Sequence, residues 1–292
     1  MILFLLVLQK MLHRILNIRG SDSPNSPIPN CRLIISKEGK ISLISKLKKC
    51  KKIIKDKIIK FSQLIDNDKL PNKISNLIGK KFIIDQNSCS IFYEDIIKSK
   101  FKILKKKDPT YFLKSIKNQT EIDNMKKAHL IDGVAVTKFI YWIKNVNKKR
   151  ITEVDAQNKL EKFRKINNSF LYPSFDTIAG SGKNGAIIHY RANKKNCKFI
   201  RNKDIFLCDS GGQYKYGTTD VTRTICFSKP NLNIKNIYTY VLKGHIAVAT
   251  TDLNKFNTGK KIDVRARKYL KQNNLDYAHG TGHGSWFFSK CS

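Results

Sequence analysis

Residues 205–225 read IFLCDSGGQYKYGTTDVTRTI, and this stretch decides the fold class. An apolar run ends at Asp209, a glycine-bearing turn follows, and a second run with alternating side chains begins after Asp220. The two aspartates are 11 residues apart. An antiparallel hairpin of that length can bring both carboxylates to one face at one end. We therefore predict two paired strands that hold Asp209 and Asp220 close together.

Two carboxylates crowded in a β scaffold repel each other, so a positive charge must offset them. A pair of divalent metal ions supplies that charge. The alternative is a pair of unrelated surface aspartates near turns. The apolar flank of Asp209 and the threonine-rich flank of Asp220 disfavour that alternative.

A second candidate is HGTGHG at residues 279–284, in which His279 and His283 are four residues apart. The glycines at 280, 282 and 284 indicate close backbone approach rather than the interior of a helix. One imidazole in such a loop can bind a metal while the other contacts substrate. Glycine-histidine loops also occur without metals, so this motif alone does not decide the function.

A third candidate is His189, which closes a predicted apolar strand over residues 186–190. Taken alone it is a satisfied rim histidine, but it could also donate to a substrate carbonyl. The preceding residues 180–185 spell GSGKNG, a match to GxGxxG. A dinucleotide site needs a helix next, and Asn184 also stands where a P-loop has Ser or Thr. We therefore predict a hairpin turn here and no phosphate site.

The rest of the chain indicates an α+β protein with a domain boundary at Asp108–Pro109, giving domains 1–108 and 109–292. The expected elements of the first domain are a hairpin with its turn at Gly39, a helix, a strand and a second helix (32–44, 47–64, 81–85 and 91–98). The second domain is expected to contain four helices (117–144, one opening at the capping box 152–155, 236–253 and 262–272). His129 falls in the apolar stripe of the first of these and is predicted to be a packed core residue.

Composition limits the possible partners. Lys and Arg number 57 against 22 Asp and Glu, a formal net charge of +35. Such a surface attracts nucleic acid, but the lysines are scattered and do not alternate with aromatics, so we favour compositional drift and expect nucleic-acid binding to be unlikely. Seven cysteines without a CxxC pair favour reduced thiols and a cytoplasmic location. The apolar residues 1–8 are too short to span a bilayer.

Together and in this order, the three candidate segments resemble the Xaa-Pro aminopeptidases of the pita-bread metallopeptidase family, more than prolidase or methionine aminopeptidase. The likeness runs from about residue 16 to residue 284. Further segments that carry it are NIRGSD, KSIKN leading to Glu121, AHLIDG, SFDTI and VLKGHIA (17–22, 114–118, 128–133, 174–178 and 241–247). The resemblance implies a pita-bread catalytic domain preceded by part of a small creatinase-type α/β domain.

The resemblance also implies roles. Asp209 resembles the aspartate that binds one metal, Asp220 the one that bridges both metals, and His283 the single histidine ligand. His189 and His279 resemble the histidines that orient substrate and stabilise the oxyanion. The implied cofactors are two divalent ions, with Mn²⁺ favoured over Zn²⁺ or Co²⁺. The implied reaction is hydrolysis of the N-terminal Xaa-Pro bond by metal-activated water, in a protein that is a homodimer when intact.

The sequence departs from the family after HGTGHG. It continues as SWFFSKCS, residues 285–292, where the family has a further strand, another histidine and two metal-binding glutamates. We read the chain as a fragment shortened at both ends, and expect no measurable peptidase activity from its 292 residues. The alternative is a catalytically dead pita-bread module that binds peptide, protein or nucleic acid.

Overall fold

The computed structural model describes residues 3–7 and 11–284. The chain divides into two compact units. Of the described residues, the first unit comprises those up to 128 and 213–218, and the second comprises 129–212 and 219–284. The sequence-based boundary at 108/109 stays a prediction. Among the described residues, no helix is long and apolar enough to cross a membrane.

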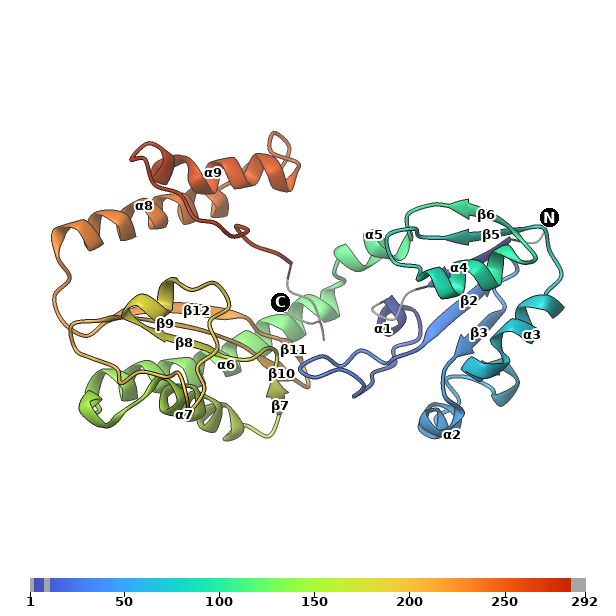
Figure 1. The fold of residues 1–292 in the computed structure, drawn as a ribbon, viewed down its shortest axis with the longest axis horizontal. Helices are drawn as coiled ribbons and strands as arrows, with labels where there is room; N and C mark the ends of the chain where they lie inside the picture. Colours follow the sequence, from blue (N-terminus) through green and yellow to red (C-terminus); the bar gives the residue numbers. More distant parts are fainter. Residues whose placement is uncertain (1–2, 8–10, 285–292) are drawn as a thin grey trace. The chain divides into compact units, whose positions relative to one another are not determined.

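The first unit is built on a six-stranded mixed sheet of order β4-β3-β2-β1-β5-β6 (Figure 1). β1 (Leu3–Val7) pairs antiparallel with β2 (Arg32–Ser36) and parallel with β5 (Lys81–Ile84). The remaining strands are β3 (Ile41–Ile44), β4 (Leu64–Ile65) and β6 (Lys102–Lys105). Its longer helices are α3 (Leu70–Asn76), α4 (Ile91–Lys98) and α5 (Thr110–Ser115), with short turns at α1 (Leu12–Ile15) and α2 (Lys51–Lys55).

Both faces of this sheet are covered, because successive residues of a strand point to opposite faces. Ile34 on β2 belongs to a buried cluster with Leu70 of α3 and Ile97 of α4. Its neighbour Leu33 belongs to a second cluster with Leu12 of α1. The sheet is therefore a two-sided apolar layer between helices.

Most sequence expectations for this unit are confirmed. The hairpin β2–β3 has its turn at Gly39, whose φ of 77° is a left-handed conformation that suits glycine. β5 and α4 lie where the pattern predicted a strand and a helix. The predicted helix over 47–64 is wrong. The chain forms only short helical turns there and breaks at Lys57 (φ 55°), which lets Ile59 bury and β4 pair with β3.

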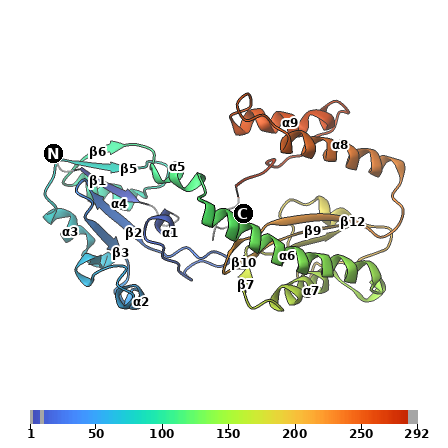
Figure 2. The same ribbon diagram turned by 180° about the vertical axis from the view of Figure 1, so that it is seen from behind.

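The second unit contains the three-stranded antiparallel sheet β8-β9-β12, formed by β8 (Ile178–Ser181), β9 (Ile205–Ser210) and β12 (Val221–Cys226). Helices α6 (Gln119–Asn145) and α7 (Glu153–Lys165) lie against one face of the sheet (Figures 1 and 2). Phe139 of α6, Leu160 of α7 and Phe206 of β9 share one buried cluster. Further elements of this unit are η6 (Gly182–Ala186), β7 (Phe170–Pro173), and the paired helices α8 (Leu232–Ala249) and α9 (Gly259–Lys271).

The predicted helices of this unit are confirmed with shifted ends. The capping box is also confirmed, because the Thr152 hydroxyl and the Asp155 carboxylate satisfy each other's backbone N–H groups. His129 as a core residue is wrong. Its side chain is exposed, because Ala128 and Asp132 take the inward positions of that turn of α6.

The strand predicted over 186–190 is wrong as well. Residues 182–186 form the 3-10 helix η6, so GSGKNG is neither a hairpin turn nor the start of a nucleotide-binding helix. The segment curls because the side chains of Asn184 and Tyr190 both turn inward to the buried carboxylate of Glu153.

Candidate metal centre

The aspartate hairpin forms as the sequence predicted. β9 and β12 pair antiparallel, with Asp209 opposite Thr222 and Ser210 opposite Val221. The Thr222 hydroxyl donates a 2.7 Å hydrogen bond to Asp209 Oδ1. Asp220 directly precedes β12, and both carboxylates are partly exposed. The period-two register thus brings an acidic pair to one end of the strand pair.

Between the two strands, the chain turns through β10 (Gly212–Tyr214) and β11 (Gly217–Thr218). Gly211 begins this turn, and a Cβ there would lie 2.0 Å from the Thr219 carbonyl oxygen and 2.3 Å from Ser174 Oγ. The Ser174 hydroxyl donates to that same carbonyl at 2.9 Å. Only glycine fits this contact, so the residue fixes how Asp209 and Asp220 approach each other.

A buried ion pair, which sequence reasoning missed, contacts β9 of the hairpin at Ser210. Arg164 of α7 donates to both carboxylate oxygens of Asp132 on α6, from Nε at 2.7 Å and from Nη2 at 3.2 Å. Nη2 also donates to Ser210 Oγ at 3.0 Å, beside Asp209. The Arg164 and Asp132 side chains are 2% and 0% exposed. This bidentate pair ties the two helices to the strand that carries the first aspartate.

His283 reaches the second aspartate. Its Nε2 lies 3.4 Å from Asp220 Oδ2. Its Nδ1 lies 3.2 Å from the Gly284 carbonyl oxygen, which can only accept a hydrogen bond. A carboxylate oxygen and an imidazole nitrogen at this separation suit a shared cation, because metal bonds of about 2.1 Å to each would span up to about 4 Å.

The donor set therefore fits a divalent cation in type, with two carboxylates and one imidazole. The geometry is partial. The structure brings Asp220 and His283 together, but among residues 3–7 and 11–284 no group of three or more His, Cys, Asp or Glu side chains is placed to hold a metal ion. Asp209 lies on the neighbouring strand and makes its hydrogen bond to Thr222 instead.

His279 lies in the same exposed loop. Its Nδ1 is 2.8 Å from the Gly280 carbonyl oxygen, and its ring stacks on Tyr277 with centroids 4.6 Å apart. The loop is outside any helix, as predicted. The expected close backbone approach is wrong for Gly280 and Gly282, since a Cβ at either would meet no described atom within 4 Å.

His189 is exposed and has a left-handed φ of 55°, a strained conformation for a residue with a side chain. The segment that carries His189 is bound by the fully buried side chain of Glu153. That carboxylate accepts hydrogen bonds from Tyr190 Oη at 2.8 Å, from Asn184 Nδ2 at 3.0 and 3.1 Å, and from two backbone N–H groups. Tyr190 has its pKa raised to about 12 by desolvation and by its bond to Glu153.

Comparison with known families decides the class of this protein. The model of metallopeptidase family M24 matches residues 123–285, more than half of the chain. The chain belongs to metallopeptidase family M24. Its residues 9–121 match the creatinase/prolidase N-terminal domain. The fold class predicted from the sequence, a pita-bread catalytic domain preceded by a creatinase-type α/β domain, is confirmed.

Among curated relatives of this M24 chain, a probable Xaa-Pro aminopeptidase P from Ajellomyces capsulatus (strain H143) is 36% identical over 285 residues, covering 92% of this chain and 45% of the relative. One from Paracoccidioides brasiliensis (strain Pb03) is 46% identical over 186 residues, covering 63% and 30%. The chain thus spans less than half the length of these relatives.

A solved structure supports the same assignment to M24. The X-prolyl aminopeptidase from Caenorhabditis elegans, described as a cytosolic enzyme with a di-nuclear active site, matches 98% of this chain and 48% of its own. The TM-score is 0.87 at 26% identity. A Xaa-Pro dipeptidase from Bacillus anthracis, at 21% identity and a TM-score of 0.76, shares the fold.

Proposed function

We propose that this M24 chain carries part of the metal centre of an aminopeptidase that hydrolyses the N-terminal Xaa-Pro peptide bond. The observation that carries the proposal is the 3.4 Å separation of His283 Nε2 and Asp220 Oδ2 at the end of the aspartate hairpin. Similarity to Xaa-Pro aminopeptidases supports the substrate class.

The proposed metal ligands are Asp209, Asp220 and His283. A pair of divalent ions, Mn²⁺ in preference to Zn²⁺ or Co²⁺, would lower the pKa of a water molecule and polarise the scissile carbonyl. The two aspartates would offset the cationic charge and fix the position of the ions against the rigid strand pair. The Nδ1 contact of His283 would hold its ring with Nε2 facing Asp220.

His189 and His279 are proposed to bind substrate rather than metal. Both side chains are exposed, so a peptide can reach them. An imidazole N–H on either would donate to the oxyanion that develops as the carbonyl becomes tetrahedral. Peptides with proline at the second position are the proposed substrates. A homodimeric parent and a cytoplasmic location are further proposals, the latter supported by the description of the Caenorhabditis elegans relative.

Calorimetric titration of the 292-residue chain with Mn²⁺ tests the ligand assignment. We expect Mn²⁺ to bind, and Asp220→Asn or His283→Ala to weaken binding at least about tenfold. Asp176→Asn is the matched control, because that carboxylate is exposed and pairs with Arg191 at 3.2 Å. Equal loss in the control, or no Mn²⁺ binding by the unmodified chain, would contradict the assignment.

The second candidate function is a module that binds a peptide or protein without catalysis. It is favoured by the lack of an assembled three-residue metal group in the described part of the chain. Mn²⁺ titration together with an Xaa-Pro-Xaa hydrolysis assay separates the two. A module would bind peptide equally with Mn²⁺ or with chelator, whereas an aminopeptidase site would bind it more tightly when Mn²⁺ is present.

A further inference from the structure

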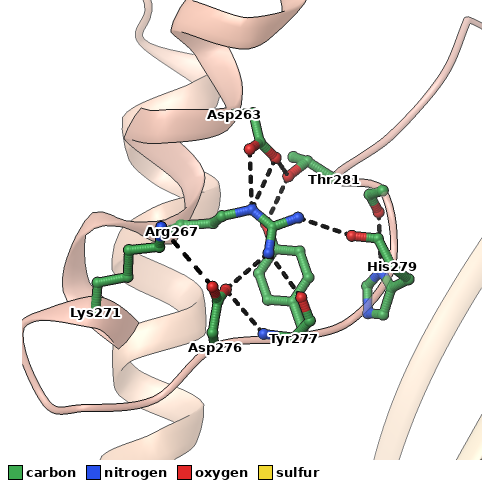
Figure 3. Close-up of polar contacts among 8 residues, drawn as sticks. Asp263, Arg267, Lys271, Asp276, Tyr277, His279 and Thr281 are labelled. Atoms are coloured by element: carbon green, nitrogen blue, oxygen red, sulfur yellow. Dashed lines mark hydrogen bonds and ion pairs between the residues drawn. The ribbon is translucent and has the colours of Figure 1, made fainter.

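Arg267 of α9 makes several contacts with the segment that leads into His279 (Figure 3). Arg267 Nη1 donates to Asp276 Oδ1 and to the Tyr277 carbonyl oxygen, both at 2.7 Å. Nη2 donates to the His279 carbonyl oxygen at 2.7 Å. A single guanidinium therefore binds two backbone carbonyls and one side-chain carboxylate of the segment that leads into the histidine motif.

The guanidinium is itself held in place. Its Nε donates to both oxygens of Asp263, one helical turn earlier on α9, at 2.9 and 3.0 Å. The guanidinium carbon lies 3.9 Å from the centroid of the Tyr277 ring. The Arg267 side chain is only 15% exposed. A lysine cannot reproduce this arrangement, because it lacks the planar set of donors.

A second set of contacts holds the part of the loop that follows His279. The hydroxyls of Tyr277 and Thr281 share a hydrogen bond of 2.6 Å, and the Thr281 hydroxyl also donates to Asp263. The Tyr277 ring, which Arg267 covers, stacks on the ring of His279 at 26°. The same cluster therefore acts on the backbone before and after His279, and ends two residues before His283.

Outside this cluster, the loop also approaches the aspartate hairpin, because His283 Nε2 lies 3.4 Å from Asp220 Oδ2. Its residues 278–284 are exposed, and Gly280 and Gly282 have open space around them. Glycine loses more backbone entropy on ordering than any other residue, so a glycine-rich loop stays ordered only if contacts offset that cost. The polar cluster on α9 supplies such contacts.

We propose that Arg267 is a positioning residue that sets where His279 and His283 stand relative to Asp220. The inference rests on the proposed function, in which this loop carries one metal ligand and one substrate-binding histidine. A purely structural role would tie the end of α9 down without affecting metal binding.

The test compares Arg267→Lys with Arg265→Lys in the 292-residue chain. Arg265 lies on the same helix, and its Nε donates to the Ala247 carbonyl oxygen and to Thr251 Oγ1, both at 3.0 Å, so it holds α8 rather than the loop. We expect Arg267→Lys to weaken Mn²⁺ binding by at least about tenfold, the range found for residues that orient metal ligands. Arg265→Lys should leave Mn²⁺ affinity within about twofold.

Hydrogen exchange measured by mass spectrometry is the second readout. Arg267→Lys should speed exchange in a peptide covering residues 276–284 at least about tenfold, with exchange in α8 unchanged. Unchanged loop exchange, or faster loop exchange with Mn²⁺ affinity intact, would overturn the positioning role. If the unmodified chain binds no Mn²⁺, the proposed function fails and the inference with it. If Asp220→Asn abolishes binding while Arg267→Lys does not, the inference alone fails.

Discussion

The buried pair of Asp132 and Arg164 gives the sharpest stability prediction. Asp132→Ala would leave the Arg164 guanidinium without its carboxylate, at a position that is only 2% exposed to solvent. Removing one partner of a buried ion pair costs about 3–5 kcal/mol, a large share of the roughly 5–15 kcal/mol that stabilises a typical domain. A bond to a neutral hydroxyl such as Ser210 Oγ cannot offset that charge.

Urea unfolding measures this loss, followed by Trp142 fluorescence in a Trp286→Phe background, since the chain has two tryptophans. At a slope of about 2 kcal/mol/M, the midpoint should fall by roughly 2 M. The matched control is Lys165→Ala, whose exposed pair with Glu161 is worth about 0.3–0.5 kcal/mol.

The double variant of Asp132→Leu with Arg164→Met removes both charges and should recover much of the loss, because apolar replacements of a buried pair are often close to neutral. If Asp132→Ala lowers the free energy of unfolding no more than Lys165→Ala does, the buried pair does not stabilise the fold by the stated amount.

Four further predictions follow from single contacts. Glu153→Gln places an amide NH₂ against groups that donate to the carboxylate, and should lower the free energy of unfolding by about 1.5–3 kcal/mol in urea titration. Gly211→Ala and Gly244→Ala put a Cβ 2.0 and 2.2 Å from a backbone oxygen, so each should cost about 1–3 kcal/mol or more by the same measurement, and a neutral effect would refute the close contacts. Burial raises the pKa of the Cys208 thiol to about 12, so iodoacetamide at pH 8 should label the partly exposed Cys226 well before Cys208, as read by mass spectrometry. Because the unfolded thiol loses its proton near pH 9 and the folded one does not, stability should fall as pH rises from about 9 to 12, less steeply in Cys208→Ala.

Sequence reasoning succeeded where a local pattern determines the structure. The pattern around Asp209 and Asp220 predicts two paired strands with both carboxylates on one face, because side-chain direction in a strand has period two, and β9 and β12 do pair. The turn at Gly39 and the cap at Thr152 are likewise set by residues within a few positions of each other. These features need no knowledge of the rest of the fold.

Sequence reasoning failed where a residue's hydrogen-bond partner lies far away along the chain. Residues 182–186 form a 3-10 helix and residues 186–190 form no strand, because Asn184 and Tyr190 bind Glu153, 31 and 37 residues away. No local pattern marks Arg164 as buried, because its partner Asp132 is 32 residues away. Arg267 carried a weak local signal, since Asp263 precedes it by four residues on a predicted helix, but its bond to the backbone of His279 had none.

The most direct test of the proposed metal centre is which histidine a bound cation approaches first. Substoichiometric Mn²⁺ broadens nearby nuclei, and the chain has six histidines whose ring signals can be assigned by substitution. We expect the His283 signal to broaden first, with His129 on the exposed face of α6 sharp at the same concentration. Equal broadening of both, or a sharp His283 signal at saturating Mn²⁺, would show that Asp220 and His283 do not share a cation.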